Sequence, residues 1–531
     1  MKIFVADKIA DEGVEFLKNQ PGLEVDFTTG LAETEVCEHI RDADAVIVRS
    51  ATSIRGKILE AGKNLKVIGR AGIGVDNIDI PAATERGIVV LNTPDANATT
   101  TAELAIAHMM SLSRYLPFAD QSIRNGKWER SSFVGAELSG KTLGIVGFGT
   151  IGRIVASRGL GLIMNVVAYD PFVTDEIFAE ACVTPMDIDQ LLECADFVTL
   201  HCPLIEQTRY LISRERLAIM KSSARLINCA RGGLIDEEAL FEALDNGQLA
   251  GAALDVYENE PPTDSPLLKL NNIVFTPHLG ASTEEAQTAV GVEIAKQIAT
   301  FLQSGEAINA LNMPRIATED ALTLKPYQEI ASKLGQLLAL MAPSAIKQLE
   351  VSLHGQIASC DPHSVAVEAL VGLLQNSLSI AVNQVNAMHL AKRQGIALTE
   401  SRSEATHDYI SMVSVKAQFV GAKSDKEEIV LSGTLINDKY PRLIQINDYQ
   451  IEAPLSGNLL ITQHSDQPGV VGALGILLGE ENINISNMQV GVKDGSDEAI
   501  AIIGISQLLS ESALGAVADI PAINKVIQVN L

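Results

Sequence analysis

A chain of 531 residues is too long for one ordinary hydrophobic core, so its length predicts about three or four domains. A composition that is 47% hydrophobic and 20% charged excludes a largely disordered protein. The formal net charge of −26 disfavours nucleic acids and anionic membranes as partners, so an anionic ligand would need locally placed arginines.

The six cysteines contain no CxxC pair, and they are too sparse for a disulfide scaffold. The N-terminus lacks an apolar signal core, and no stretch of about eighteen uninterrupted apolar residues suggests a membrane span. We therefore expect a protein of a reducing compartment, the cytoplasm.

Residues 1–97 alternate short apolar runs with amphipathic stretches. The apolar runs predict strands at residues 3–5, 45–48, 65–68 and 88–90. Strands that alternate with helices indicate a parallel sheet covered on both faces. We expect this segment, completed by residues 286–313, to form a flavodoxin-like α/β substrate-binding domain.

Residues 98–285 show a stronger pattern that predicts a Rossmann nucleotide-binding domain inserted into the first domain. A helical run over residues 98–116 closes at Pro117, and a series of strands typical of a six-stranded sheet begins after Lys141. The motif GFGTIG follows the first of these strands. Its glycines allow a tight turn, approach of a pyrophosphate and close helix packing, and the helix start offers N–H groups to phosphate. The residues concerned are Gly147, Gly149, Thr150, Ile151 and Gly152.

Asp170 ends the next strand and can accept hydrogen bonds from the hydroxyls of an adenine ribose. Its charge would repel a 2′-phosphate, so the sequence predicts NAD as the cofactor and not NADP. The alternative is a glycine-rich turn in an α/β sheet that binds no ligand. Hydride transfer to a nicotinamide requires no metal, and we expect none.

Three further motifs, NCARGGLIDEEAL, LDVYENEPP and TPHLGAST, follow GFGTIG in an order that resembles the D-isomer-specific 2-hydroxyacid dehydrogenases. The resemblance implies catalytic roles for Arg231, Glu260 and His278. Neutral His278 can take a hydroxyl proton, and the carboxylate of Glu260 can fix its tautomer. Arg231 can bind a substrate carboxylate through two parallel hydrogen bonds. Taken singly, each could be an ordinary loop or surface residue. The resemblance also implies that Arg231, His278, Cys202, Cys229, Ala230, Asp255 and Gly280 line the nicotinamide pocket.

The segments VRSAT, GRAGIGVDNID and GKWER are similar to the branch of this family that acts on 3-phosphoglycerate. The resemblance implies that the backbone of Gly72, Ile73 and Gly74 receives the substrate carboxylate. It also implies that Arg49, Arg70 and Arg130 meet the phosphate, with Arg130 supplied by a partner subunit. Ile73 stands where some relatives have threonine, so one hydroxyl contact to the cofactor is absent. The alternative is that these arginines are ordinary surface or salt-bridged residues.

Residues 314–456 resemble, by length and by VNQVNAMHLAKRQGI, the α+β intervening domain of the longer family members. Lys392, Arg393, Lys439 and Arg442 are candidate anion contacts there. Residues 457–531 predict a ferredoxin-like βαββαβ unit that resembles the ACT regulatory domain. This implies L-serine as a feedback inhibitor at His464, Asp466 and Asn484, between paired domains of a dimer or tetramer. A solvent-exposed turn on a structural dimer arm is the alternative.

The predicted function is thus NAD-dependent oxidation of 3-phospho-D-glycerate to 3-phosphohydroxypyruvate, the first step of L-serine biosynthesis. The same arginines could support 2-oxoglutarate reduction as a side activity. Two alternatives stay open. One is a dehydrogenase of another 2-hydroxy acid, such as glycerate or D-lactate, and the other is a corepressor-type protein that senses NAD without turnover.

Overall fold

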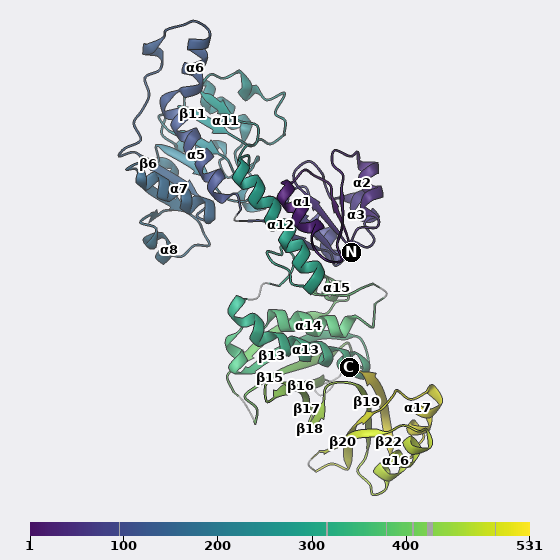
Figure 1. Cartoon of the computed structure of the whole chain (residues 1–531). Helices are drawn as coiled ribbons and strands as arrows, with labels where there is room; N and C mark the ends of the chain where they lie inside the picture. The colour runs from purple at the N-terminus through teal and green to yellow at the C-terminus, as the bar shows by residue number, and fades with distance from the viewer. Residues whose placement is uncertain (95, 315–316, 379, 406–407, 422–427, 494) are drawn as a thin grey trace. The chain divides into compact units, whose positions relative to one another are not determined.

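The computed structural model describes the chain apart from residues 95, 315–316, 379, 406–407, 422–427 and 494 and the side chains of residues 318–319. Figure 1 shows the path of the chain and the labels of its elements. The described residues divide into two compact units. One consists of residues 1–53, 69–77 and 91–309, and the other of residues 54–68, 78–90 and 310–531.

The N-terminal segment forms a five-stranded sheet in the order β2-β1-β3-β4-β5. Its strands are β1 (Lys2–Val5), β2 (Glu24–Phe27), β3 (Ala45–Val48), β4 (Val67–Arg70) and β5 (Val89–Leu91), and its helices are α1 (Asp11–Lys18), α2 (Glu33–Ile40), α3 (Gly56–Ala61) and α4 (Ile80–Glu85). The sequence predicts four of these strands and misses β2. This edge strand contains Glu24 and Asp26 and has no fully buried residue, so it lacks the apolar run that marks the others.

Residues 98–285 contain a second parallel sheet, in the order β12-β11-β10-β9-β6-β7-β8. Its strands are β6 (Thr142–Val146), β7 (Asn165–Tyr169), β8 (Thr184–Pro185), β9 (Phe197–Leu200), β10 (Arg225–Asn228), β11 (Gly251–Leu254) and β12 (Ile273–Phe275). The sequence predicts six strands, and the seventh is the two-residue edge strand β8. Consecutive residues of one strand, such as Ile145 and Val146 of β6, enter different hydrophobic clusters because their side chains point to opposite faces. Both faces of this sheet are therefore covered, as in a Rossmann-type fold.

The helices of this part are α5 (Ala98–Arg114), α6 (Leu116–Arg124), α7 (Thr150–Gly161), α8 (Asp175–Glu180), α9 (Ile188–Cys194), α10 (Arg214–Ile219) and α11 (Glu237–Asp245), and α12 (Glu284–Ser304) follows it. The predicted end of the first helix at Pro117 is wrong. Tyr115 adopts a left-handed conformation that ends α5, and Pro117 lies in the first turn of α6, where its missing N–H costs no helical hydrogen bond. Helix α12 has a cap at each end: the hydroxyl of Thr283 accepts the backbone N–H of Ala286, and Gly305 adopts a left-handed conformation after the last turn.

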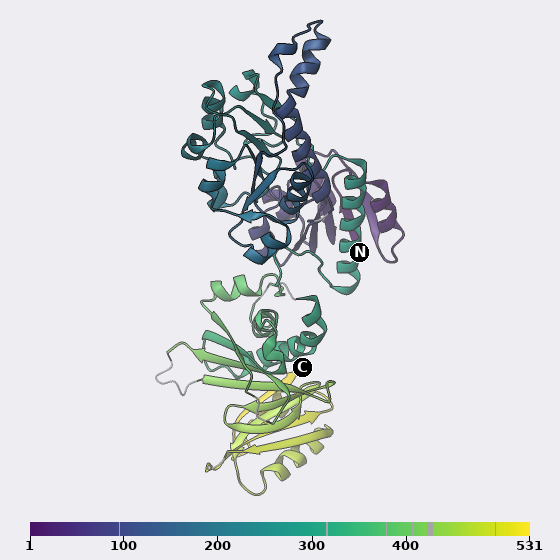
Figure 2. The ribbon, with the colours of Figure 1, turned by 90° about the vertical axis from the view of Figure 1, so that its left-hand side faces the viewer.

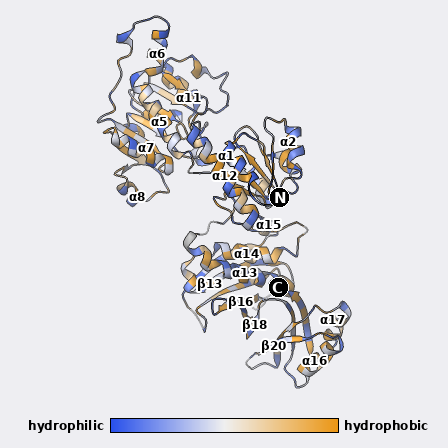
Figure 3. Cartoon of the chain, viewed as in Figure 1, coloured by the Kyte–Doolittle hydropathy of each residue, from blue (hydrophilic) through white to orange (hydrophobic). Residues whose placement is uncertain are grey.

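The intervening segment forms a mixed six-stranded sheet in the order β14-β13-β15-β16-β17-β18, in which only the β13–β14 pair is parallel among the described pairs. Its elements are α13 (Thr318–Met341), β13 (Ile346–Gly355), α14 (His363–Leu374), α15 (Ala387–Arg393), β14 (Ala397–Ser403), β15 (Ser411–Phe419), β16 (Glu428–Ile436), β17 (Tyr440–Ile446) and β18 (Tyr449–Pro454). In Figure 3, α14 shows more of the orange that marks hydrophobic residues than the largely blue α2 does. Helix α14 packs on α13 so closely that a Cβ at Gly372 would lie 1.8 Å from the carbonyl oxygen of Ser332.

The C-terminal segment has the predicted βαββαβ order, with an antiparallel sheet β20-β21-β19-β22. Its elements are β19 (Asn458–Ser465), α16 (Val470–Glu480), β20 (Ile485–Val492), β21 (Glu498–Ile505), α17 (Glu511–Ala518) and β22 (Ile523–Asn530). Figure 2 shows its helices on one side of the sheet. Leu460 and Ile503 face these helices, whereas Ile461 and Ile502 join the core of the intervening segment. Both faces of this sheet are therefore buried.

No helix among the described residues is long and apolar enough to cross a membrane.

Candidate active site

The turn between β6 and α7 depends on its glycines for different reasons. Gly147 has a φ of 96°, and a Cβ there would lie 2.7 Å from the backbone nitrogen of Cys202. A Cβ at Gly152 would lie 2.1 Å from the carbonyl oxygen of Gly147. No atom lies within 4 Å of a Cβ at Gly149, so the space next to this residue is open. Two glycines thus allow the turn to close and the third leaves room for a ligand, as a dinucleotide pyrophosphate at the start of α7 requires.

Asp170 stabilises this turn from the end of β7. Its carboxylate accepts hydrogen bonds from the backbone N–H groups of Phe148, at 2.8 Å, and Phe172, at 3.0 Å. Each bond uses a different carboxylate oxygen, so each oxygen keeps a further acceptor position. The residue can therefore hold the loop and still accept hydrogen bonds from ribose hydroxyls. Together with the open space at Gly149, these donors and acceptors fit NAD.

His278 and Glu260 form a hydrogen-bonded pair, with 2.8 Å between Nδ1 of the imidazole and Oε2 of the carboxylate. The other carboxylate oxygen accepts the backbone N–H of Tyr257 at 3.2 Å. The hydrogen bond to Glu260 raises the pKa of His278 above its usual value, against the opposite effect of burial. Burial would raise the pKa of Glu260, but the hydrogen bond and charge of His278 outweigh it and lower that pKa. The imidazole is thus a stronger base than free histidine, with Nε2 left for a substrate.

Arg231 lies against the predicted carboxylate-binding loop. Its Nε donates to Asp76 at 3.0 Å and its Nη1 donates to the carbonyl of Ala230 at 2.6 Å. A Cβ at Gly74 would lie 1.9 Å from Nη2 of Arg231, so the guanidinium lies directly against the backbone of this loop. The positive charge of Arg231 also lowers the pKa of both His278 and Glu260, which means that the three predicted catalytic residues share one site.

Arg70 extends this positive region on the other side of the loop. Its Nη1 donates to the carbonyl of Ala71 at 3.0 Å, and a Cβ at Gly72 would lie 1.6 Å from the same nitrogen. Burial, followed by the charges of Arg231 and Arg49, lowers the pKa of Arg70 to about 10. Three guanidinium groups that repel one another, in a protein with a net charge of −26, favour an anionic ligand.

The residues that neutralise part of this charge were not predicted from the sequence. Asp76 pairs with Arg231, and Asp7 accepts the backbone N–H of Arg49 at 2.6 Å and the hydroxyl of Thr52 at 2.6 Å. Asp76 lies within the GRAGIGVDNID motif, so this motif could have identified it as a residue of the site. Asp7 follows strand β1, where polar residues of parallel sheets commonly form sites.

The chain is similar to known proteins of one family over its whole length. Residues 106–280 match the model of the D-isomer specific 2-hydroxyacid dehydrogenase NAD binding domain, and residues 323–447 that of the D-3-phosphoglycerate dehydrogenase intervening domain. The chain is 41% identical to D-3-phosphoglycerate dehydrogenase of Methanocaldococcus jannaschii, with 100% of both chains covered. It is 37% identical to that of Bacillus subtilis, with 100% of this chain and 99% of the relative covered. The chain belongs to the D-3-phosphoglycerate dehydrogenases. The predicted family, function, enzyme class and NAD cofactor are thereby confirmed.

Two solved structures each match 59% of this chain. The TT0316 protein from Thermus thermophilus matches with a TM-score of 0.55 and 35% identity over 59% of this chain and 100% of its own. D-Lactate dehydrogenase from Aquifex aeolicus, solved with NAD and lactic acid, matches with a TM-score of 0.53 and 26% identity over 59% and 100%.

The two cysteines among the residues predicted to line the nicotinamide pocket have unreactive thiols. Burial raises the pKa of Cys202 to about 11, and it raises that of Cys229 as well. Both thiols therefore stay protonated at neutral pH and can only line a pocket. The Asp255 carboxylate is fully buried and accepts the backbone N–H groups of Leu279, at 2.7 Å, and Gly280, at 2.9 Å. Its place in the nicotinamide pocket stays a prediction.

Two groups of predicted residues take no part in the contacts described above. Arg130 is exposed in the short 3-10 helix Arg130–Ser132, and the site described above forms without it. In the C-terminal unit, Asp466 follows β19 at the end where Ser465 pairs with Glu498, whereas Asn484 bonds Ser506 near the other end. The length of β19 separates these ends by about 20 Å. His464, itself buried, lies near Asp466, so the three predicted effector residues do not form one cluster within a chain.

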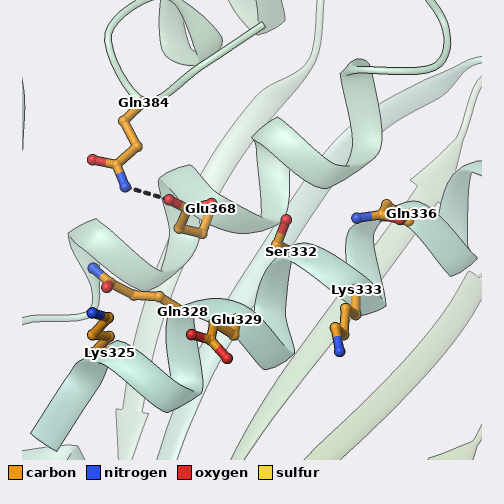
Figure 4. Close-up of a pocket in the computed structure, with 8 residues that line it drawn as sticks. All are labelled: Lys325, Gln328, Glu329, Ser332, Lys333, Gln336, Glu368 and Gln384. Carbon is orange, nitrogen blue, oxygen red and sulfur yellow. Dashed lines mark hydrogen bonds between the residues drawn. The ribbon is translucent and has the colours of Figure 1, made fainter. Parts of the chain in front are cut away.

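A pocket of about 370 Å³ lies in the intervening segment, between α13, α14 and the following loop. Figure 4 shows Gln384 donating a hydrogen bond to the carboxylate of Glu368, whose pKa is raised by burial. The lining residues are Lys325, Gln328, Glu329, Ser332, Lys333, Gln336, Glu368 and Gln384. The anion contacts predicted for this segment, Lys392, Arg393, Lys439 and Arg442, are not among them and stay predictions.

Proposed function

We propose that His278 is the base by which this enzyme oxidises the C2 hydroxyl of 3-phospho-D-glycerate to 3-phosphohydroxypyruvate. The observation that supports this most directly is the His278–Glu260 hydrogen bond beside Arg231. In this mechanism Nε2 of His278 takes the hydroxyl proton, and Glu260 stabilises the imidazolium that results. Arg231 binds the substrate carboxylate and polarises the oxygen at C2. When bound, NAD⁺ supplies the acceptor for the hydride that leaves C2.

The arginines around the glycine loop select the phosphorylated substrate in this proposal. Residues 72–74 belong to the flavodoxin-like domain, and their backbone binds the substrate carboxylate. Arg49 and Arg70 bind the phosphate. Their mutual repulsion, which lowers the pKa of Arg70, is relieved when the substrate brings negative charge. Arg130 is proposed to reach this site from a partner subunit, because the active site within one chain forms without the Arg130 of that chain. 2-Oxoglutarate, with two carboxylates, could use the same arginines in the reductive direction.

The C-terminal unit is proposed to be an ACT domain that binds L-serine in a cytoplasmic homo-oligomer. His464 and Asp466 lie at one end of the sheet and Asn484 near the other. A single serine could therefore meet all three only where two copies pair, so that one chain offers the first two residues and its partner the third.

Steady-state turnover of 3-phosphoglycerate with NAD⁺, compared with D-glycerate and D-lactate, tests the proposed substrate. We expect kcat/KM for 3-phosphoglycerate to exceed both by about 100-fold, as a lost charge-assisted contact implies. Equal values would favour another 2-hydroxy acid, and absence of turnover with retained NAD binding would favour a corepressor-type protein. Addition of L-serine to the same assay tests inhibition, and unchanged rates together with no heat of binding in calorimetry would reject the effector site.

A further inference from the structure

The backbone around the catalytic histidine is held in an uncommon conformation. His278 has a φ of 54°, in the left-handed region that residues other than glycine rarely adopt. Such a conformation is unfavourable by itself and persists only where the surroundings impose it. The residues that fix this loop, which we define as residues 276–280 and call the catalytic loop, therefore decide where the imidazole points.

Asp255 holds the catalytic loop from the interior. Its carboxylate accepts the N–H groups of Leu279 and Gly280 and the hydroxyl of Thr276, the last at 2.6 Å. Its backbone carbonyl accepts the N–H of His278 at 2.9 Å. A carboxylate with no exposed surface that accepts three hydrogen bonds defines the positions of its donors closely.

Helix α5 holds the same loop at two further points. The hydroxyl of Thr101 donates to the carbonyl of Gly280 at 2.8 Å, and Nε2 of His108 lies 3.0 Å from Oγ1 of Thr276. Thr276 uses its only hydroxyl hydrogen toward Asp255, so it must accept a hydrogen from His108. This fixes the proton of His108 on Nε2. The two α5 residues are seven positions apart, about two helical turns or 10 Å, and so lie on one face of the helix.

We infer that His108 and Thr101 are positioning residues for the reaction, which fix the catalytic loop through Thr276 and Gly280 and thereby direct His278 toward Glu260. The inference rests on the role proposed for His278. His108 is 3% exposed, and burial lowers its pKa, so at neutral pH it is an uncharged donor within the core. Neither α5 residue touches the substrate or the cofactor in this account; both act through the loop.

The alternative is that His108 merely fills space in the core. His108→Leu, His108→Gln and Met109→Leu separate the two. Leucine keeps the volume and loses the donor, and glutamine restores an N–H donor. Met109 is the neighbouring buried residue of α5, and leucine there conserves volume, so it is the matched control. If His108 positions the loop, His108→Leu should lower kcat about tenfold or more, because small displacements of a catalytic group are costly. The KM for NAD⁺ should stay within about twofold, and His108→Gln should recover most of the rate.

The pH profile of kcat supplies a readout that packing alone would not move. The pKa of His278 is raised chiefly by its hydrogen bond to Glu260 and further by Asp255, while burial and Arg231 lower it. A loosened catalytic loop weakens the first of these contributions. The acid limb of the profile should therefore move to lower pH in His108→Leu and stay in place in Met109→Leu. Identical kcat and pH profile in the two leucine variants would overturn the inference.

A double-mutant cycle with Thr276→Val tests whether His108 acts on the catalytic loop through Thr276. If His108 acts through Thr276, then His108→Leu should cause no further loss of kcat in the Thr276→Val background, whereas additive losses would contradict the path. If His108→Leu fails to fold, Thr101→Val, which removes the contact at the other end of the loop, replaces it in the comparisons of kcat, KM and pH profile. His278→Asn is measured beside them. Full activity in that variant defeats the proposed base, whereas its loss of activity beside an unaffected His108→Leu defeats only the inference drawn from α5.

Discussion

Nδ1 of His278 lies 2.8 Å from Oε2 of Glu260, a residue that precedes it by 18 positions in the chain. The hydrogen bond gives the histidine a raised pKa and leaves its second nitrogen for the substrate. Oxidation requires the neutral base, so the rate falls as the pH decreases through the pKa of His278.

Glu260→Gln should move that acid limb to lower pH. The amide cannot stabilise the imidazolium by charge, so the pKa of His278 falls and the neutral base persists to lower pH. The same change should reduce kcat by about tenfold or more, because the developing imidazolium is less stabilised. The measurement is kcat/KM for 3-phosphoglycerate from pH 5 to 9. An acid limb that stays in place or moves to higher pH would contradict the contribution of Glu260.

Arg49→Gln should raise the KM for 3-phosphoglycerate by about 10- to 100-fold, the effect of one lost charge-assisted contact. The KM for D-glycerate should change little, because this substrate has no phosphate to lose a partner. Arg41→Gln, at an exposed arginine after α2, is the matched control. Equal effects on both substrates would remove Arg49 from phosphate recognition.

Gly149→Ala should weaken NADH binding about tenfold without changing thermal stability. A Cβ at Gly149 meets no protein atom within 4 Å, so any cost arises from the bound dinucleotide. Gly161→Ala, at the end of the same helix and also with open surroundings, is the control. Fluorescence titration with NADH gives the affinity. An unchanged dissociation constant for Gly149→Ala would show that the pyrophosphate binds elsewhere.

Gly13→Ala should destabilise the packing of α1 on α12. A Cβ there would lie 2.5 Å from the carbonyl oxygen of Gly291, a backbone atom that can move only with its helix. We expect a loss of about 1–3 kcal/mol, the usual cost of overpacking, seen as a lower midpoint in thermal unfolding. Gly161→Ala again provides the comparison. If the two variants unfold at the same temperature, the helices do not pack at this distance.

The order and chemistry of the motifs could be predicted because each is contained in a short segment. GFGTIG lies between a strand and a helix. The positions of its glycines indicate by themselves where the backbone must turn tightly or pack closely. TPHLGAST likewise identifies His278 by its neighbours, and the structure brings it to Glu260 and Arg231 as expected. In the fold, the edge strand β2 was missed because its polar residues produce no apolar run.

The partners of these residues could not be predicted, because they depend on contacts between distant segments. Arg231 meets Asp76 across 155 positions, and His108 meets Thr276 across 168. No local pattern reports such pairs. The effector residues show the opposite case, in which residues predicted to lie together lie near opposite ends of a sheet. His464 and Asn484 are predicted to bind one ligand, yet the length of β19 separates the ends of the sheet near which they lie.

The most direct test of the account is the turnover of His278→Asn with 3-phosphoglycerate and NAD⁺. Asparagine tolerates the left-handed backbone of this position better than alanine, so the catalytic loop should keep its conformation while the base is lost. The account predicts a kcat reduced by about 100-fold or more, with the affinity for NADH unchanged. A variant that retains the full rate would contradict the assignment of His278 as the base.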